Sequence, residues 1–247
     1  MDFAALYQRL KKKEEEAWTC GVVIVAAGSA RRMGFDKLSY LLDGKPVLVR
    51  AILAFEQVPQ VEEIVVVTRE DRLEDVAALC HDSGAKKVSA VVCGGKTRTE
   101  SALAGVMALK KDCHLTAVHD GARPLVSKEL IEACINKASV QYAAIPVLKS
   151  TDTLREVDEK GTLIGTCDRD RVVRVQTPQV FQTELIKGAL SDAVMRGLEF
   201  TDDATAVERL GVRIQTVEGE EENLKLTTPQ DIALAEEILK RRKERQA

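Results

Sequence analysis

Short, continuous apolar runs rich in valine and isoleucine recur along the chain. They cover residues 21–27, 63–68, 88–92, 115–119 and 142–147. A run of this length without polar alternation is typical of a strand that is buried on both faces of a parallel sheet. The runs therefore predict a central sheet that is covered on both sides.

Segments with helical periodicity fill the intervals between these runs. They cover residues 46–57, 71–83, 99–110 and 127–138, and Ser127 is a good N-cap for the last of them. Because strand and helix alternate, each helix can cross over between parallel strands. The pattern predicts an α/β fold in which residues 20–247 form a single domain with a doubly wound, mainly parallel, Rossmann-like sheet.

The alternation breaks after residue 150. Residues 151–175 are rich in charged and β-branched side chains and carry a turn signal, Asp-Glu-Lys-Gly, which predicts a β-arm that projects from the sheet as a hairpin. Further helices are expected at 183–195, from 201 and from 228, with a strand at 213–217. Residues 1–19 show a short apolar helical face and predict an N-terminal helical extension.

Composition restricts the partners and the compartment. The chain has 45% hydrophobic and 30% charged residues and a net charge of −3, so it lacks the broad positive field that nucleic acids or membrane surfaces require. Its six cysteines include no Cys-x-x-Cys pair, and reduced thiols are typical of the cytosol. No apolar stretch approaches the roughly 20 residues of a membrane span. We therefore expect a cytoplasmic protein with no nucleic-acid or membrane partner.

The first apolar run leads directly into a loop that suits an anion. Small residues at Ala26, Ala27 and Gly28 let backbone N–H groups approach a phosphate, and Arg32 and Lys37 add charged donors for a polyphosphate. In an open α/β sheet, ligands bind at the carboxyl ends of the strands, where this loop lies. A dinucleotide-binding fingerprint is excluded, because positions 30 and 33 are not glycine. A solvated turn is the alternative interpretation.

A second loop follows the run at 88–92. Its residues Gly94, Gly95 and Ser101 can line a base or ribose pocket, and an ordinary tight connection is the alternative. A Walker A loop is excluded, because Ala90 stands where that motif needs its first glycine.

A third loop follows the run at 115–119 and is expected at the same sheet edge. Asp120 in this loop can hold Mg²⁺ or substrate hydroxyls, and Arg123 lies three residues further on. An aspartate turn before a proline is the structural alternative. We interpret His119 as a packed residue at the end of the strand rather than as a base.

Together these residues resemble the 2-C-methyl-D-erythritol 4-phosphate cytidylyltransferase family of the non-mevalonate isoprenoid pathway. The resemblance runs from Gly21 to near the C-terminus. Its ordered motifs are residues 26–28 with Arg32-Met33, Gly44-Lys45-Pro46, Gly94-Gly95 with Arg98 and Ser101, His119-Asp120-x-Ala122-Arg123-Pro124, Asp152-Thr153, Asp168-Arg169, Gln176-Thr177-Pro178-Gln179, Thr201-Asp202-Asp203 and Asn223-Leu224-Lys225. The resemblance implies a nucleotidyltransferase that joins CTP to a small polyol phosphate with the help of Mg²⁺ and releases pyrophosphate.

The resemblance also implies a role for each matching residue. The expected catalytic residues are Arg32, Lys37 and Lys225. The expected CTP pocket consists of Ala26, Ala27, Gly28, Gly94, Gly95 and Ser101. The expected substrate contacts are Asp120, Arg123, Thr153, Arg169, Thr177, Thr201 and Lys225, and Asp120 is the candidate metal ligand.

The chain departs from the family pattern beside Lys37, where Asp36 replaces the usual proline and is expected to weaken polyphosphate binding slightly. Two alternatives stay open: a ribitol 5-phosphate cytidylyltransferase with the same fold and motifs, and a catalytically inactive nucleotide-binding protein. The arm at 151–175 predicts a homodimer in which Thr153 and Arg169 complete the site of the other copy, because a lone two-stranded ribbon is only marginally stable.

Overall fold

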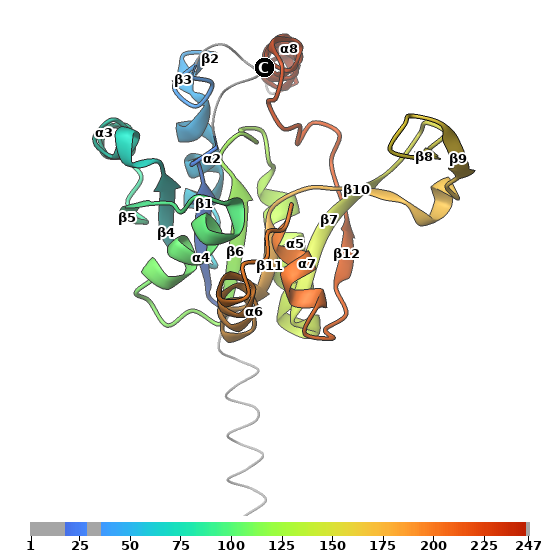
Figure 1. Cartoon of the computed structure of the whole chain (residues 1–247). Helices are drawn as coiled ribbons and strands as arrows, with labels where there is room; N and C mark the ends of the chain where they lie inside the picture. Colours follow the sequence, from blue (N-terminus) through green and yellow to red (C-terminus); the bar gives the residue numbers. More distant parts are fainter. Residues whose placement is uncertain (1–17, 29–35, 246–247) are drawn as a thin grey trace, which may run out of the picture.

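The computed structural model describes residues 18–28 and 36–245 and has one large twisted sheet at its centre (Figure 1). The strand order is β10-β7-β11-β6-β1-β4-β5, and β12 lies beside β7. One half of the sheet is wholly parallel and consists of β1 (Cys20–Val25), β4 (Val61–Thr68), β5 (Val88–Cys93) and β6 (Leu115–Asp120). Each of these strands corresponds to a predicted apolar run.

The other half of the sheet mixes strand directions. It consists of β7 (Ala143–Lys149), β10 (Val173–Val175), β11 (Gln179–Gln182) and β12 (Gln215–Glu218). The strand β11 runs antiparallel between β6 and β7, β10 is antiparallel to β7, and β12 is parallel to β7. The prediction of a mainly parallel sheet is confirmed, although β11 was not predicted, because four residues with little periodicity carry no clear strand signal.

Helices cover both faces of the sheet, as the doubly wound prediction requires. On one face lie α2 (Val47–Glu56), α3 (Leu73–Asp82), which follows the short 3₁₀ turn η1 (Glu70–Arg72), and α5 (Lys128–Gln141). On the other lie α4 (Arg98–Ala108), α6 (Thr183–Met195) and α7 (Asp203–Glu208). The strand β1 shows why helices are needed on both faces. Val22 and Ile24 pack against the helices of the first face, and Val23 packs against those of the second.

The last helix, α8 (Pro229–Glu244), begins where a helix was predicted, and a capping box and a proline stand at its start. It packs over the small hairpin of β2 (Leu41–Leu42) and β3 (Lys45–Pro46) through a separate apolar cluster that contains Leu42, Leu226 and Ile232. This cluster holds the chain around residue 226 close to the segment that follows the first loop.

The projecting arm is visible on the right of Figure 1, where β8 (Arg155–Val157) pairs antiparallel with β9 (Leu163–Thr166). Its turn closes with a hydrogen bond of 3.0 Å from the N–H of Gly161 to the oxygen of Asp158. A second 3₁₀ turn, η2 (Arg169–Arg171), leads back to the body. The hairpin prediction is confirmed, but the last residues of the predicted arm form β10 in the central sheet.

Two predictions concern the ends and the environment of the chain. The predicted extension at 1–19 lies outside the described residues, except for Trp18 and Thr19. Within residues 18–28 and 36–245, no helix is both long enough and apolar enough to cross a bilayer.

Candidate functional site

A cavity of about 490 Å³ lies where the carboxyl ends of β1 and β6 meet the start of α4. It brings together most of the sequence-predicted site residues from segments far apart in the chain. Those that line it are Ala26, Ala27, Gly28, Lys37, Gly95, Ser101, Asp120 and Lys225. The expectation that these loops share one sheet edge is therefore confirmed.

The glycines at 94 and 95 let their loop lie close against the start of α4. A Cβ atom on Gly95 would lie 2.3 Å from Cβ of Glu100, and one on Gly94 would lie 2.6 Å from Oγ of Ser101. The helix begins with a capping box formed by Thr97 and Glu100. A side chain at either position would push the loop away from the helix. Of the two, Gly95 lines the cavity and Gly94 does not, so the predicted contact of Gly94 with the nucleotide stays a prediction.

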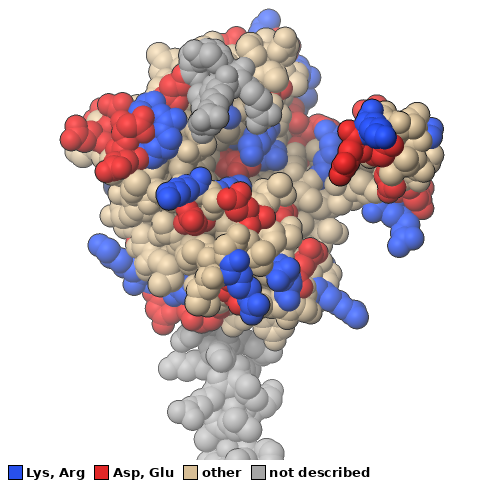
Figure 2. Space-filling view, in the orientation of Figure 1, with Lys and Arg blue, Asp and Glu red and all other residues tan. Residues whose placement is uncertain are grey.

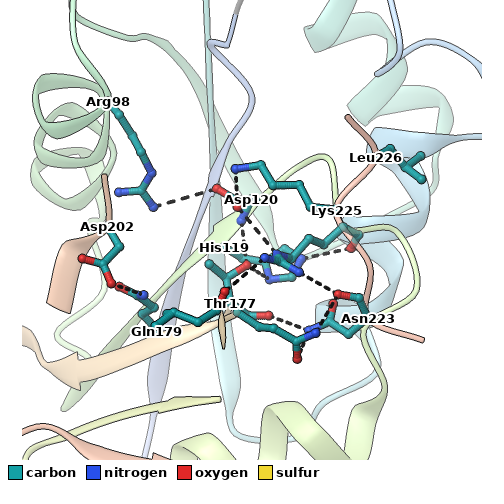
Figure 3. Close-up of polar contacts among 12 residues, drawn as sticks. Arg98, His119, Asp120, Thr177, Gln179, Asp202, Asn223, Lys225 and Leu226 are labelled. Carbon is teal, nitrogen blue, oxygen red and sulfur yellow. Dashed lines mark hydrogen bonds and ion pairs between the residues drawn. The ribbon is translucent and has the colours of Figure 1, made fainter. Parts of the chain in front are cut away.

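Positively charged side chains surround the carboxylate of Asp120 in the site (Figure 3). Lys225 Nζ lies 2.8 Å from Oδ2 of Asp120, Nε of Arg123 lies 3.6 Å from the same oxygen, and Nη2 of Arg98 lies 3.8 Å from Oδ1. Although burial opposes the shift, the charges of Lys225, Arg98 and Arg123 lower the pKa of Asp120 to about 2. The carboxylate is therefore ionised at neutral pH and holds three cations near it, of which Lys225 and Arg98 line the cavity.

Arg98 has a second carboxylate partner that no local sequence signal connects to it. Its guanidinium donates to both carboxylate oxygens of the buried Asp203, at 2.8 and 2.7 Å, across 105 positions in the chain. Gln179 holds the start of α7, where Asp203 lies, because its Oε1 accepts from the N–H groups of Asp203 and Ala204, both at 2.9 Å. Although burial opposes it, the acids raise the pKa of Arg98. Both Arg98 and Asp203 belong to the motifs quoted above, but sequence reasoning gave neither a role.

Lys37 also lines the cavity, and its Nζ donates to the main-chain oxygen of Leu226 at 2.8 Å. The neighbouring Asp36 faces away into an ion pair: its Oδ2 lies 2.6 Å from Nη1 of Arg72 and accepts from Oγ of Ser39 at 2.6 Å. Although burial opposes the shift, these two partners lower the pKa of Asp36. The negative charge that departs from the family pattern is thus paired locally rather than directed at the cavity.

The remaining predicted residues lie outside the cavity wall. Arg123 and Thr177 are buried behind Asp120, and Nη1 of Arg123 donates to the main-chain oxygen of Asn223 at 2.7 Å. Thr201 is exposed just before α7, and Thr153 and Arg169 are exposed on the arm. Arg32 lies outside the described residues. His119 is fully buried, which confirms its interpretation as a packed residue.

The described part of the chain offers little for a protein-held metal ion. Asp120 is the one carboxylate among the described residues that line the cavity, and no group of three or more His, Cys, Asp or Glu side chains within the described ranges could hold a metal. A magnesium ion at Asp120 would therefore take most of its ligands from a bound nucleotide's phosphates and from water. Over the rest of this face, acidic and basic side chains are interspersed and form no broad positive field (Figure 2).

A glycine-lined, cation-rich cavity at the carboxyl ends of an open α/β sheet is the binding site of a nucleotide-dependent enzyme. A sequence model of a family described as 2-C-methyl-D-erythritol 4-phosphate cytidylyltransferase matches residues 20–241. The chain belongs to this family.

Individual relatives agree with the family match. The 2-C-methyl-D-erythritol 4-phosphate cytidylyltransferase of Caldanaerobacter subterraneus subsp. tengcongensis is 39% identical over 226 residues, with 89% of this chain and 98% of the relative covered. The enzyme of the same name from Desulforamulus reducens is 41% identical over 227 residues, with 89% and 95% covered.

Solved structures agree in fold. The 4-diphosphocytidyl-2C-methyl-D-erythritol synthase of Anaerococcus prevotii superposes with a TM-score of 0.80 at 30% identity, covering 90% of this chain and 99% of the other. The cytidylyltransferase of Thermus thermophilus gives a TM-score of 0.71 at 33% identity, with 90% and 98% covered.

Proposed function

We propose that the chain transfers the cytidylyl group of CTP to 2-C-methyl-D-erythritol 4-phosphate and releases pyrophosphate, as a step in isoprenoid precursor synthesis. The observation that carries this proposal is the cavity in which Lys37, Lys225 and Arg98 approach one space from three different segments. A cluster of cations around a small cavity suits a reaction between two phosphorylated molecules. The family match supports the choice of CTP and of the polyol phosphate.

The chemistry is an in-line attack by a phosphate oxygen of the substrate on the α-phosphorus of CTP. The bond between the α-phosphorus and the oxygen that bridges it to the β-phosphate breaks, and pyrophosphate leaves with the electron pair. A phosphate monoester with a second pKa of about 6 is mostly dianionic at neutral pH, so the attack needs no general base. The site agrees with this, because burial lowers the pKa of His119 to about 4 and the ring lies behind Asp120, away from the cavity wall.

The protein's contribution is to hold two anions together and to stabilise the charge that develops on the α-phosphate. Lys37 and Lys225 line the cavity and are the proposed catalytic cations, together with Arg32. Asp120 keeps Lys225 in place at 2.8 Å. A Mg²⁺ ion carried by the CTP phosphates would neutralise part of their charge.

The nucleotide pocket is proposed to accept cytosine and to reject purines. Its wall consists of small residues and main chain at Ala26, Ala27, Gly28 and Gly95, with Ser101 behind them. We expect main chain this close to the base to admit a pyrimidine ring and to leave too little room for a purine, so ATP and GTP should be poor substrates.

The decisive experiment measures pyrophosphate release with CTP, Mg²⁺ and each polyol phosphate in turn. We expect turnover with methylerythritol phosphate, little with ribitol 5-phosphate, and little when ATP replaces CTP. Comparable turnover of ribitol 5-phosphate would contradict the substrate assignment. No turnover with either acceptor would indicate an inactive nucleotide-binding protein.

We also propose that the enzyme is a cytoplasmic homodimer whose arms reach across the two-fold axis. The hairpin of β8 and β9 exposes Val157, Leu163 and Ile164, and an isolated two-stranded ribbon with exposed apolar side chains needs another surface to pack on. A second copy supplies that surface, and Thr153 and Arg169 on the arm would then lie at the other copy's cavity. Free cysteines throughout the chain are compatible with a reducing compartment.

Mixing two inactive variants tests the exchanged arms. A heterodimer of an Arg169→Ala chain and an Asp120→Ala chain has one intact site if the arm acts on the partner, and none if each arm serves its own chain. We expect recovered turnover on mixing. Verified heterodimers without recovered turnover would show that the arms are not shared.

A further inference from the structure

His119 is completely buried beside the cavity, and the proposed reaction gives its imidazole ring no chemical step. The ring packs edge-on against Phe55, with 4.9 Å between the ring centroids. Both of its nitrogens nevertheless have polar partners. Nε2 lies 3.1 Å from the main-chain oxygen of Arg123, and Nδ1 lies 3.0 Å from Oγ1 of Thr177.

The chemistry of these partners fixes the direction of each hydrogen bond. A carbonyl oxygen only accepts, so Nε2 carries the hydrogen and donates to Arg123. Full burial disfavours a charged ring, and a neutral ring with hydrogen on Nε2 has a lone pair on Nδ1. Nδ1 therefore accepts from the hydroxyl of Thr177, whose oxygen in turn accepts from the N–H of Asp120 at 3.1 Å. This hydrogen-bond chain runs one way, from Asp120 through Thr177 and His119 to Arg123.

The hydrogen-bond chain begins and ends in the same turn of the main chain. The N–H of Arg123 donates to the oxygen of Asp120 at 2.9 Å, which closes the turn at residues 120–123. Thr177 and His119 brace this turn from behind, and all of these groups are buried (Figure 3). A buried chain of hydrogen bonds of this kind holds the groups that it joins in one geometry.

Contacts connect both proposed catalytic lysines to this same turn at residues 120–123. The main-chain N–H of Leu226 donates to the oxygen of Ala122 at 2.9 Å, and the oxygen of Leu226 accepts from Nζ of Lys37 at 2.8 Å. Lys225, the preceding residue, lies on Asp120 itself. A shift of the turn would therefore move Asp120, Lys225 and the contact of Lys37 together.

We propose that His119, as the neutral Nε2–H tautomer, is a positioning residue that aligns Asp120 and the two lysines through Thr177. The expected effect on turnover rests on the proposed function, whereas the assignment of the tautomer does not. The single hydroxyl hydrogen of Thr177 is committed to His119. Thr177 therefore acts on the ring and is not a donor to the substrate's phosphate, in contrast to the role that the family resemblance implies.

Substitutions at Thr177 test the inference without creating a cavity at His119. Thr177→Val keeps the shape of the side chain and removes its hydroxyl, so we expect kcat to fall by roughly tenfold to a hundredfold while KM for the polyol phosphate changes little. Thr177→Ser should recover most of that loss, because it restores the hydroxyl. A raised KM with normal kcat in Thr177→Val would place the hydroxyl on the substrate and overturn the proposal.

A matched control comes from another buried threonine. Oγ1 of Thr116 on β6 is 3.0 Å from Oγ1 of Thr183, away from the cavity. Thr116→Val removes a buried hydroxyl as Thr177→Val does, and we expect it to leave kcat unchanged. If both variants lose turnover equally, the loss at Thr177 reflects general destabilisation and the positioning role is wrong.

Nitrogen-15 NMR of the histidine rings provides a readout that needs no turnover, so it remains decisive if the substrate assignment fails. The resonances of His119 are identified by elimination with His81→Gln and His114→Gln. Near neutral pH we expect a protonated Nε2 and a bare Nδ1 at His119, and a shift of the Nδ1 resonance in Thr177→Val but not in Thr116→Val. A protonated Nδ1, or a resonance indifferent to Thr177→Val, would overturn the proposal.

Discussion

The two lysines of the cavity carry the same charge but are held in very different ways. Lys225 is itself 41% exposed, but it is paired at 2.8 Å with Asp120, a carboxylate that belongs to a buried network of main-chain and side-chain hydrogen bonds. Lys37 lies on a loop whose neighbour Asp36 is held at the surface by Arg72, with both side chains partly exposed. One lysine is therefore held by a buried carboxylate, and the loop of the other depends on a partly exposed ion pair.

Because the two lysines are held differently, substitutions near them should have different effects on stability and turnover. A buried network is costly to disturb, because any group that loses its partner stays out of contact with water. A partly exposed ion pair can be replaced by water at little cost. Changes on the Lys225 side should therefore affect both stability and turnover, and changes on the Lys37 side should affect turnover with little loss of stability.

The largest effect is expected from Arg98→Ala on the buried side. It leaves Asp203, which is 1% exposed, without its bidentate partner, and removing one member of a buried pair typically costs about 3–5 kcal/mol. Urea denaturation measures the change in the free energy of unfolding. The matched control is Arg69→Ala, which breaks an exposed pair with Asp71 and should cost much less. Equal losses in the two variants would remove the contrast between the two sides.

Alanine substitution of each lysine addresses the comparison directly. We expect Lys37→Ala and Lys225→Ala each to lower kcat by about 10²- to 10³-fold, because each removes a cation that meets the transition state. Equal loss in kcat and kcat/KM would mark such a contact. Only Lys225→Ala should also lower the unfolding free energy, since it deprives Asp120 of its nearest cation. Lys111→Ala, which breaks an exposed pair with Glu62, is the control.

Near-normal turnover in Lys37→Ala would show that Arg31 or Arg32 has taken over its role. In that case Lys37 itself would supply no essential charge, and the comparison of the two lysines would reduce to Lys225.

The sequence predicted the residues of the site better than it predicted their partners, and the reason is physical. The apolar runs that become β1, β4 and β6 are buried on both faces, so burial specifies them, whereas β5 at the edge of the sheet is only partly buried. Small and charged residues at the carboxyl ends of such strands indicate an anion site, because the topology brings those ends together. The fold and most of the cavity residues could therefore be predicted from local pattern.

The partners of those residues could not be predicted in the same way. The pairing of Arg98 with Asp203 and of Thr177 with His119 joins segments 105 and 58 positions apart, and it depends on the insertion of β11 between β6 and β7. The same limit explains Asp36, which was expected to repel a polyphosphate. Its partner Arg72 lies in the segment that leads into α3, where no pattern in the sequence connects the two.

The charge on Asp120 should make the buried side sensitive to acid. Its pKa is lowered from the usual 3.8 to about 2 in the folded chain, so its contribution to stability is present above about pH 4 and is lost as the pH falls toward 2. The shift corresponds to about 2 kcal/mol. The difference in unfolding free energy between wild type and Asp120→Asn should therefore shrink over this interval. A difference independent of pH would show that the cations do not stabilise the ionised carboxylate.

The smallest effect is expected at the surface pair of Asp36 and Arg72. Arg72→Gln removes the charge that offsets Asp36, and with both side chains partly exposed the cost in stability should stay below about 1 kcal/mol. The freed carboxylate would then lie one residue from Lys37 and repel the phosphates, so KM for CTP should rise several-fold, and more at low salt than at high salt.

The exchanged pair Asp36→Arg with Arg72→Asp separates charge from position, because it restores the ion pair and reverses its direction. If the pair serves to hold the loop, the double variant should bind CTP about as well as wild type does. If Asp36 acts only through its charge near the phosphates, an arginine at 36 should bind CTP more tightly than wild type. Asp75→Asn is the control, since Asp75 is the other, more exposed partner of Arg72 at 3.0 Å and lies away from Lys37. A rise in KM for CTP in Asp75→Asn as large as that in Arg72→Gln would show that the orientation of Arg72, rather than its contact with Asp36, controls this side of the site.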